Sequence, residues 1–287
     1  MKNNCININR LFLVAGYDAQ NTADQSLLYL VQSLSKNGDV ILFMDCNCNK
    51  EQLKKFEKDC LFVEAVRHGE YDFGSYKRAY LYAKKQNILE NYDFLYLVND
   101  SVYGPLKDIT EYLNKMESMQ TDAFGLVCNP HPEHPHIQSW FIGCTRKVFL
   151  TDWFDKFICS VKKQSDKGTV TKLYEQGFSK LVLDHGLKWN CLYSVSGRKI
   201  YNNVKSLYQQ GLPFIKKAAF TRHNGELGRQ ILYVLNRTNK NVSDVILINA
   251  KRVYGEKYIN WLLTKNPIKI IIRKITYALR KIFVEGI

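Results

Sequence analysis

Short apolar runs alternate with amphipathic segments along most of the first 200 residues. Each run has the length of a buried strand, and between the runs apolar residues recur every three or four positions, as in a helix. This alternation predicts an α/β fold: a Rossmann-like, mostly parallel sheet with helices on both faces. We expect strands at residues 10–15, 39–44, 61–66, 94–98, 123–128, 137–144 and 189–194. We expect helices near residues 25–34, 53–60, 72–86, 106–119, 149–157 and 170–184.

The positive charge is concentrated in the last third of the chain. Residues 1–200 hold 25 Lys and Arg against 23 Asp and Glu, whereas residues 201–287 hold 16 against 4, so the net charges are +2 and +12. Such asymmetry indicates an anionic partner for the basic part, either phospholipid or nucleic acid. We expect one domain at residues 1–205 and a basic helical region at residues 206–287.

The N-terminal sequence has neither the apolar core nor the cleavage site of a signal peptide, so we expect a cytoplasmic chain. Its eight cysteines are scattered, and we expect free thiols. Cys46 and Cys48 could be half of a metal site, but no second pair or suitably spaced histidine follows. The histidines at 131, 134 and 136 alternate with prolines, and their spacing matches no zinc pattern.

The predicted strand at residues 94–98 ends abruptly in Asn99, Asp100 and Ser101, before a Tyr-Gly-Pro turn. In open α/β sheets ligands bind beyond the carboxyl ends of the strands, where an acid between an amide and a hydroxyl can take part in chemistry. We therefore take Asp100 as the centre of a candidate site. Alternatively, Asn99 and Asp100 form a turn in which they accept hydrogen bonds from nearby backbone N–H groups.

Other polar residues follow the expected strands and can share a crevice with Asp100. Their chemistry suits a nucleotide-linked substrate, because a tyrosine can stack on a base and basic side chains can neutralise phosphates. Asp100 can hold a Mg²⁺ or Mn²⁺ ion that bridges a diphosphate. The residues expected on the donor side are Gly16, Tyr17, Arg67, Asp72, Gly74, Lys77, Asn99, Asp100 and Ser101.

Two common nucleotide-binding classes are excluded, because no GxGxxG follows the first strand and no GxxxxGK[ST] occurs. Each donor-side residue also has a structural interpretation. Arg67 and Lys77 can be surface charges, Asp72 can cap a helix, and Tyr17 can be a partly buried packing residue.

The segment at residues 268–283 predicts a cationic amphipathic helix. Its apolar face holds Ile268, Ile271, Ile272, Ile275, Leu279 and Ile282, against Lys269, Arg273, Lys274, Arg280 and Lys281. Charges interrupt every window long enough to span a bilayer, so we expect a helix that lies on an anionic leaflet. The alternative is a helix packed on its own domain or on a partner protein, with its basic side in water.

Five segments in order, YDFGSYKRAY, YLVNDSVYGPL, HIQSWF, YEQGFSKLV and GLPFIK, resemble the rhamnan synthesis protein F family. These are glycosyltransferases of bacterial cell-surface polysaccharides such as lipopolysaccharide or capsule. The resemblance spans about residues 10–220. It implies a GT-A-like fold, a nucleoside-diphosphate-sugar donor with rhamnose as the default sugar, and transfer to a growing glycan, which we expect to be lipid-linked. The expected location is the inner face of the plasma membrane.

The resemblance also implies roles for single residues. GT-A enzymes usually carry an Asp-x-Asp motif for a metal, and this chain departs from it with Asn99-Asp100-Ser101, so only Asp100 keeps the acid. Glu175 matches the catalytic base of an inverting enzyme. Asp184 and His185 are second choices, as base and as second metal ligand. We expect His136, Gln138 and Ser139 on the acceptor side.

Two other classes of function compete with this one. A nucleic-acid-binding protein could use the basic C-terminal third, where Tyr201, Tyr208, Tyr254, Tyr258 and Trp261 lie among the charges, although no known nucleic-acid-binding motif is present. A GT-A-like scaffold without catalysis is the other, because Ser101 replaces the second acid.

Overall fold

The computed structural model describes residues 8–221 and 226–284, and the chain divides into two compact units. Unit 1 comprises Met1–Asp100 and Asp108–Val195, and unit 2 comprises Ser101–Lys107 and Ser196–Ile287. The sequence places one break after residue 205. The structure instead divides the chain after Val195 and gives a short internal segment, Ser101–Lys107, to unit 2.

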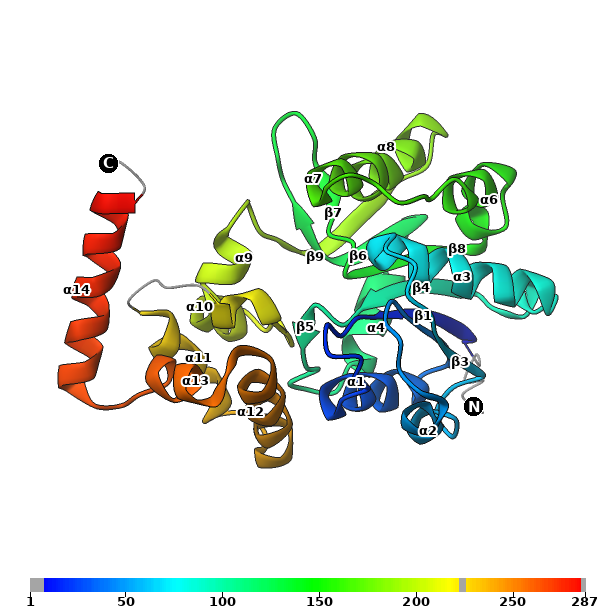
Figure 1. Ribbon diagram of the computed structural model, residues 1–287. Coiled ribbons are helices and arrows are strands. Elements are labelled where there is room, and N and C mark those ends of the chain that lie inside the picture. Colours follow the sequence, from blue (N-terminus) through cyan, green and yellow to red (C-terminus); the bar gives the residue numbers. More distant parts are fainter. Residues whose placement is uncertain (1–7, 222–225, 285–287) are drawn as a thin grey trace, which may run out of the picture. The chain divides into compact units, whose positions relative to one another are not determined.

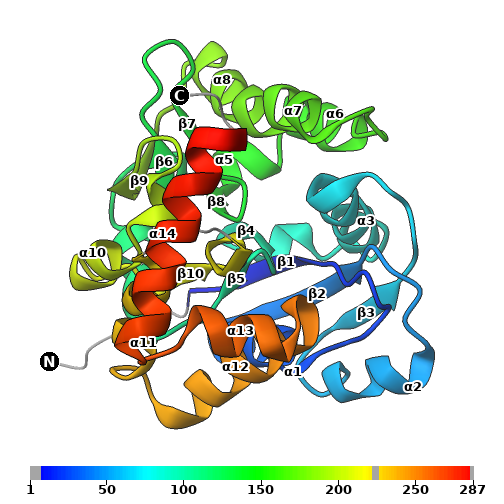
Figure 2. The ribbon, with the colours of Figure 1, turned by 60° about the vertical axis from the view of Figure 1, so that its left-hand side comes forward.

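Within the described residues, unit 1 contains an eight-stranded sheet in the order β3-β2-β1-β4-β8-β6-β7, with β9 beside β6. The strands are β1 (Arg10–Gly16), β2 (Asp39–Met44), β3 (Phe62–Ala65), β4 (Phe94–Asn99), β6 (Ala123–Asn129), β7 (His136–Ile137), β8 (Phe141–Thr145) and β9 (Trp189–Ser194). Figure 2 shows β1, β2 and β3 side by side. β7 and β8 run opposite to the other strands of this sheet. The carboxyl ends of the parallel strands and the starts of β7 and β8 therefore lie along one edge.

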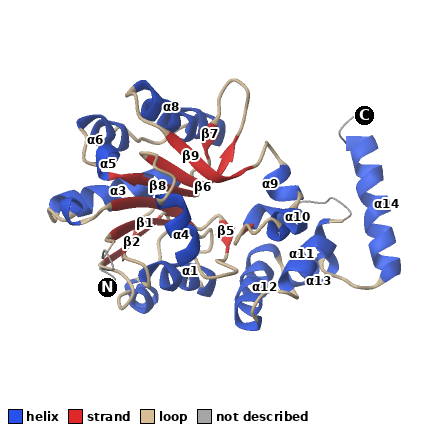
Figure 3. Cartoon of the chain, turned by 180° about the vertical axis from the view of Figure 1, so that it is seen from behind, coloured by secondary structure: helices blue, strands red, loops and turns tan. Residues whose placement is uncertain are grey.

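Helices cover both faces of this sheet, as expected (Figures 1 and 3). They are α1 (Gln25–Ser35), α2 (Lys50–Leu53), α3 (Tyr71–Lys85), α4 (Thr110–Glu117), α5 (Arg146–Phe149), α6 (Asp152–Cys159), α7 (Lys167–Val170) and α8 (Gly177–Asp184). A π-helical turn, Thr171–Gln176, joins α7 to α8. The mostly parallel α/β architecture predicted from the alternation is confirmed.

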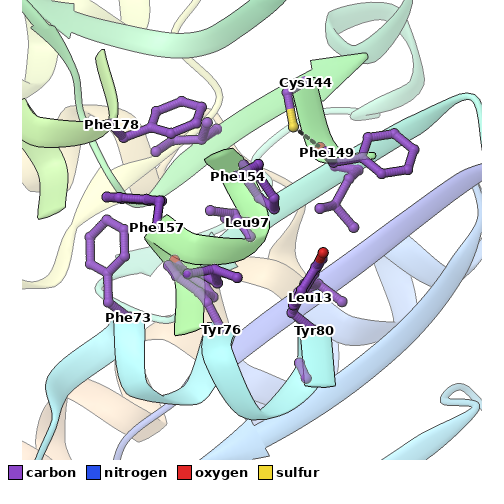
Figure 4. Close-up of a cluster of buried hydrophobic side chains, with 14 of the residues drawn as sticks. Leu13, Phe73, Tyr76, Tyr80, Leu97, Cys144, Phe149, Phe154, Phe157 and Phe178 are labelled. Atoms are coloured by element: carbon purple, nitrogen blue, oxygen red, sulfur yellow. Dashed lines mark hydrogen bonds between the residues drawn. The ribbon is translucent and has the colours of Figure 1, made fainter. Parts of the chain in front are cut away.

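The core follows from the two-residue period of the strands. Leu13 and Leu97 face one side of the sheet and pack in a cluster with α3 and α6. Figure 4 shows Tyr76 and Tyr80 of α3 close to these leucines. On the other side Phe12 stacks on Tyr96 with ring centroids 4.9 Å apart, on the face that α1 and α4 cover. Since both faces of the central strands are buried, these strands read as continuous apolar runs.

Some predicted bounds are wrong. The expected strand at residues 137–144 is two strands, because a turn at Gln138–Trp140 separates β7 from β8, with the Trp140 indole donating to the Gln138 side chain at 2.8 Å. The helix expected from residue 106 begins at Thr110. The helix expected at residues 53–60 ends early: α2 is followed by a single 3-10 turn, Lys54–Phe56.

A buried ion pair joins α4 to the sheet. Arg10 of β1 donates to both carboxylate oxygens of Glu117, each at 2.6 Å, and to the Asn114 side chain at 2.9 Å. The Tyr96 hydroxyl also donates to Glu117 at 2.6 Å. Both charged side chains are at most 8% exposed, so neither can exchange its partner for water without disturbing the fold.

Unit 2 is mainly helical. Its elements are β5 (Val102–Tyr103), α9 (Lys199–Asn202), α10 (Val204–Gln209), β10 (Ile215–Lys216), α11 (Leu227–Leu235), α12 (Lys240–Tyr254), α13 (Glu256–Leu262) and α14 (Pro267–Val284). The sequence reasoning missed β5 and β10, which pair antiparallel. The buried Tyr103 hydroxyl donates to Asn249 of α12 at 2.5 Å, so a strand from the middle of the chain is fixed into the helical unit.

The final helix keeps an exposed apolar stripe. Arg273, 2% exposed, lies against Trp261 and donates to the Leu262 carbonyl, and Lys274 pairs with Glu226. Ile268, Ile271, Ile272, Ile275 and Leu279 are between 46% and 67% exposed. The predicted Arg280, Lys281 and Ile282 lie outside the residues whose side chains are described. No helix in the described part of the chain is long and apolar enough to cross a bilayer.

Candidate functional site

The carboxyl end of β4 carries two buried polar residues, as the sequence predicts. Asn99 is 1% exposed and Asp100 8%. The Asn99 side chain donates to the Asp72 carboxylate at 2.7 Å, at the start of α3. The Asp100 backbone N–H donates to the Ala15 carbonyl at 3.1 Å, which places this residue beside the end of β1. The strand end therefore brings two acids and an amide together.

A tyrosine hydroxyl lies beside Asn99. Tyr76 of α3 is fully buried, and its hydroxyl donates to the Ser139 carbonyl at 3.0 Å. Burial raises the pKa of Tyr76 well above its ordinary value, and the negative charges of Asp72, Glu175 and Asp100 raise it further. A hydrogen bond with Asn99 lowers this pKa but does not offset the increase. The hydroxyl thus bonds Asn99 and Ser139, and these two residues in turn donate to the carboxylates of Asp72 and Glu175.

Glu175 projects from the π-helical turn towards the turn between β7 and β8. The Ser139 hydroxyl donates to one oxygen of Glu175 at 2.6 Å, and His136 Nε2 lies 3.3 Å from the other. His136 Nδ1 lies 2.7 Å from the His134 carbonyl. Burial lowers the pKa of His136, but the hydrogen bonds to Glu175 and to this carbonyl, with the charge of Glu175, outweigh burial and raise it. π-helical turns occur often at functional sites.

The same edge continues to β2 and β3, where a second polar group fixes a loop. The Asp45 carboxylate accepts the backbone N–H groups of His68 at 2.8 Å and Gly69 at 3.1 Å. His68 Nδ1 accepts the N–H of Glu70 at 3.0 Å, so Nε2 carries the proton and faces the Ser75 hydroxyl at 3.0 Å. Burial, and then the charge of Arg78, lower the pKa of His68 to about 4. These hydrogen bonds hold the loop, and its imidazole is neutral near pH 7.

The expected phosphate-binding cations differ in availability. Arg67 donates to the Asn21 side chain at 2.8 Å and lies 5.6 Å from the ring of Tyr17, which is 52% exposed. Lys77 is 3.0 Å from the Glu70 carboxylate and donates to the Val161 carbonyl at 2.5 Å. Arg67 and Tyr17 therefore form an accessible pair, whereas Lys77 is engaged in holding α3.

The family model for rhamnan synthesis protein F matches residues 44–285, most of the chain. The chain belongs to the rhamnan synthesis protein F family. The chain is also 23% identical, over 193 residues, to the uncharacterized protein y4gN of Sinorhizobium fredii (strain NBRC 101917 / NGR234). That match covers 66% of this chain and 50% of y4gN, so the chain spans about half the length of the curated relative it matches.

Three solved structures are distantly similar to this family member. A putative nucleotide-diphospho-sugar transferase from Desulfovibrio desulfuricans G20 has 13% identity and a TM-score of 0.42, covering 80% of this chain and 98% of that one. Core-mannan synthase A from Aspergillus fumigatus, in its Mn/GDP form, has 13% identity and a TM-score of 0.31, covering 52% and 63%. The mannosyltransferase Ktr4p from S. cerevisiae, in complex with GDP, has 9% identity and a TM-score of 0.34, covering 59% and 64%.

Several predicted site residues of this rhamnan synthesis protein F family member do not join the cluster. Asp184 and His185 end α8 just before β9 begins, so they lie at the opposite, amino edge of the sheet. Asp184 pairs with Lys180 at 2.5 Å, and His185 stacks on Trp153 at 4.7 Å. Ser101 belongs to unit 2, where Lys216 donates to its hydroxyl at 2.7 Å.

Packing explains why two predicted donor-side residues are glycines. A Cβ on Gly74 would lie 2.7 Å from the His68 ring, and one on Gly16 would lie 2.9 Å from side-chain atoms of Leu27 and Met44. Gln138, expected on the acceptor side, is buried, and its carbonyl accepts the Trp140 indole N–H. These three residues shape the edge of the sheet through packing.

The sequence reasoning gave no role to Tyr76, Asp45 or His68. Asp45 directly follows a predicted strand, and Asp100 comes two residues after another, so the position of Asp45 at a strand end was the available signal. Tyr76 lies on the apolar face of α3, where the helical period indicates core packing, and nothing in that period shows where its hydroxyl points.

The cluster does not form a resident metal cage. Within the described ranges no three His, Cys, Asp or Glu side chains gather to hold an ion. A cation at Asp100 would take its other ligands from phosphate oxygens and water, which Mg²⁺ and Mn²⁺ accept.

Proposed function

We propose that this chain transfers a sugar from a nucleoside-diphosphate donor to a growing surface glycan through a GT-A-like domain in unit 1. Rhamnose is the family's default sugar, and a lipid-linked glycan is the proposed acceptor. The observation that carries the proposal is a hydrogen-bonded group at the edge where α/β sheets bind ligands. Asn99, next to Asp100, donates to Asp72 at 2.7 Å, the Tyr76 hydroxyl donates to the Ser139 carbonyl at 3.0 Å, and the Ser139 hydroxyl donates to Glu175 at 2.6 Å.

The proposed reaction is a direct displacement with inversion. Glu175 accepts the proton of the acceptor hydroxyl while the acceptor oxygen attacks the anomeric carbon. The bond from that carbon to the β-phosphate oxygen breaks, and the nucleoside diphosphate leaves with the electron pair. Inversion follows because the acceptor attacks the face opposite the leaving group.

The departing diphosphate gains negative charge, which cationic groups stabilise. We assign this role to Arg67, because Lys77 is already held by Glu70 and the Val161 carbonyl. Tyr17, exposed beside Arg67, would stack on the base. A Mg²⁺ or Mn²⁺ ion held by Asp100 would neutralise further phosphate charge when bound.

The aromatic residues of unit 2 give little support to the nucleic-acid alternative. Tyr208, Tyr254 and Tyr258 donate their hydroxyls to backbone carbonyls within the unit, and Arg273 lies over Trp261. Aromatic rings engaged in this way are poorly placed for stacking on bases. The exposed isoleucine stripe of α14 instead favours an anionic leaflet, and we propose that the chain is peripheral on the inner face of the plasma membrane.

The test is a panel of nucleoside-diphosphate sugars, with Mg²⁺, Mn²⁺ or EDTA, in which release of the nucleoside diphosphate is measured. Glu175→Gln should lower turnover by about 100-fold or more with little change in donor binding, because it removes the proton acceptor. Asp100→Asn should weaken donor binding, read as a smaller thermal stabilisation by the nucleoside diphosphate.

Glu111→Gln is a matched control, since that exposed carboxylate pairs with Lys115 on the surface of α4, away from the candidate site. If no donor turned over and none stabilised the protein, the non-catalytic scaffold would be the better account.

A further inference from the structure

The two oxygens of the Glu175 carboxylate are held from two directions. The Ser139 hydroxyl donates to Oε2 at 2.6 Å, and His136 Nε2 lies 3.3 Å from Oε1. Both partners come from the short stretch at the start of β7 and the turn after it. The position of Glu175 therefore depends on a segment distant from it in the sequence.

The surroundings of His136 fix how many protons its ring carries. Nδ1 faces the His134 carbonyl, which can only accept a hydrogen bond, and Nε2 faces a carboxylate, which as an anion can also only accept. A neutral imidazole has one N–H and cannot donate to both. The pair must therefore hold one additional proton, either as an imidazolium beside a carboxylate or as a neutral ring beside a carboxylic acid.

The environment favours the imidazolium beside the carboxylate. The Ser139 hydroxyl donates to the same carboxylate, which stabilises its charged form. On the neighbouring strand β6, a hydrogen bond from Cys191 lowers the pKa of Cys128 to about 6, and the charge of Cys128 favours a cation at His136. The titratable groups facing His136 are thus Glu175 and Cys128, and a negative charge on either one favours a proton on the ring.

The ring has little freedom to leave this arrangement. The His136 side chain is 5% exposed. The next backbone N–H, that of Ile137, donates to the fully buried Ser179 hydroxyl of α8 at 3.0 Å, which holds β7 in place. The imidazole is therefore part of a buried support and offers little surface for direct contact with a substrate.

We propose that His136, as an imidazolium, and Ser139 are positioning residues that keep Glu175 ionised and aimed at the acceptor hydroxyl. This inference rests on the proposed function, because it assigns a support to the proposed base. The sequence predicted His136 on the acceptor side, and this proposal instead assigns it the role of supporting Glu175. Enzyme in which His136 has lost its proton no longer holds Oε1 of Glu175 by an ion pair, so turnover falls at high pH.

The experiment compares pH profiles of donor turnover for the wild type, His136→Gln, Ser139→Ala and Ser179→Ala. The wild type should lose kcat above the raised pKa of His136, and His136→Gln should lack that alkaline limb. We expect its plateau kcat to be about 100-fold lower, since misplacement of a reacting group by about 1 Å costs this much. The KM for the donor should change little.

Ser179→Ala is the matched control, because it disturbs β7 without touching Glu175, and it should keep the alkaline limb. Cys128→Ser tests whether ionisation of the Cys128 thiol, and not of His136, causes the fall of kcat at high pH. A second readout needs no activity: the ¹⁵N shifts of the His136 ring should report two protonated nitrogens at pH 7.

The outcomes separate the two proposals. A His136→Gln enzyme with the kcat and pH profile of the wild type would overturn the positioning role, as would a neutral His136 ring at pH 7. A wild type that turns over no donor, yet shows the doubly protonated ring, would overturn the glycosyltransferase function and leave the proton assignment intact.

Discussion

In the folded protein, the surroundings of His68 disfavour protonation of its ring. Its ring accepts a backbone N–H at Nδ1 and faces Ser75 at Nε2, and burial followed by the charge of Arg78 lowers its pKa to about 4. An unfolded histidine binds its proton near pH 6.5, so between these values the unfolded chain binds more protons than the folded one. This contribution to stability is therefore complete above about pH 6.5 and is lost as the pH falls towards 4.

We predict that His68→Gln is less sensitive to acid than the wild type over this range. The free energy of unfolding, measured with urea at pH 7 and pH 5, should fall less in the variant. The variant itself should be less stable at pH 7, because it loses the fit against Gly74 and Ser75. Equal losses in the two proteins would show that another group governs the acid sensitivity.

The buried Arg10–Glu117 ion pair allows a prediction about the free energy of unfolding. Glu117→Ala should destabilise the protein by about 3–5 kcal/mol, because it leaves the guanidinium buried without its carboxylate. The double variant Arg10→Met/Glu117→Leu should cost less than the single one, since it removes both charges together. Urea unfolding of the three proteins checks this order. A double variant less stable than Glu117→Ala would contradict it.

Residue positions at strand ends could be predicted, whereas directions of side chains could not. Asn99 and Asp100 were predicted at the site because a parallel sheet collects strand ends at one edge. Glu175 rested on the family resemblance, and its contacts depend on a π-helical turn that the helical period does not reveal. His136 is near Glu175 because β7 pairs antiparallel with β6. A strand of two residues is too short to show a sequence pattern, so this pairing could not be predicted.

At the scale of elements, α14 shows how an amphipathic pattern becomes a surface. Its Arg273 and Lys274 contact the rest of unit 2, and the apolar stripe is exposed. The sequence placed Arg273 among the outward basic residues, and it is buried, because its guanidinium reaches the Leu262 carbonyl at the end of α13. The spacing of apolar residues distinguishes the two faces of a helix but does not say which of them the protein covers.

We predict that α14 binds the full chain to anionic vesicles. Ile271→Asp/Ile275→Asp should abolish flotation with vesicles of phosphatidylglycerol and phosphatidylethanolamine, since it places charge on the stripe. Binding should also weaken as salt rises, because surface charges are then screened. Leu183→Asp is the control: that leucine is 52% exposed on α8 and should not matter. Undiminished flotation of the double variant would refute this role for α14.

At the scale of the whole molecule, the chain passes between the two units more than once. β4 ends in unit 1, Ser101–Lys107 belongs to unit 2, and α4 returns to unit 1. The sequence predicted two regions because the charge changes along the chain. It could not predict the internal segment, since β5 is two residues long and its partner β10 lies far along the chain, at Ile215–Lys216.

We predict that a chain ending after residue 205 fails to fold, although the sequence suggests that boundary. It would lack β10 and Asn249, so Val102 and Tyr103 would lose the partners that bury them. A chain ending after residue 266 removes only α14 and the residues after it, and should remain soluble. Soluble yield and thermal unfolding of the two chains test this. A stable, monomeric 1–205 fragment would show that β5 does not need its partner.

The segment Ser101–Lys107, which contains β5, also limits how genes for such chains can be recombined. A single crossover in the gene, placed where the charge changes, would transfer the helices of unit 2 but leave behind the segment that Tyr103 anchors among them. A chimera between relatives therefore needs matching codons for Ser101–Lys107 together with those for Ser196 onward. Exchange of the basic part should succeed only where both stretches come from the same parent.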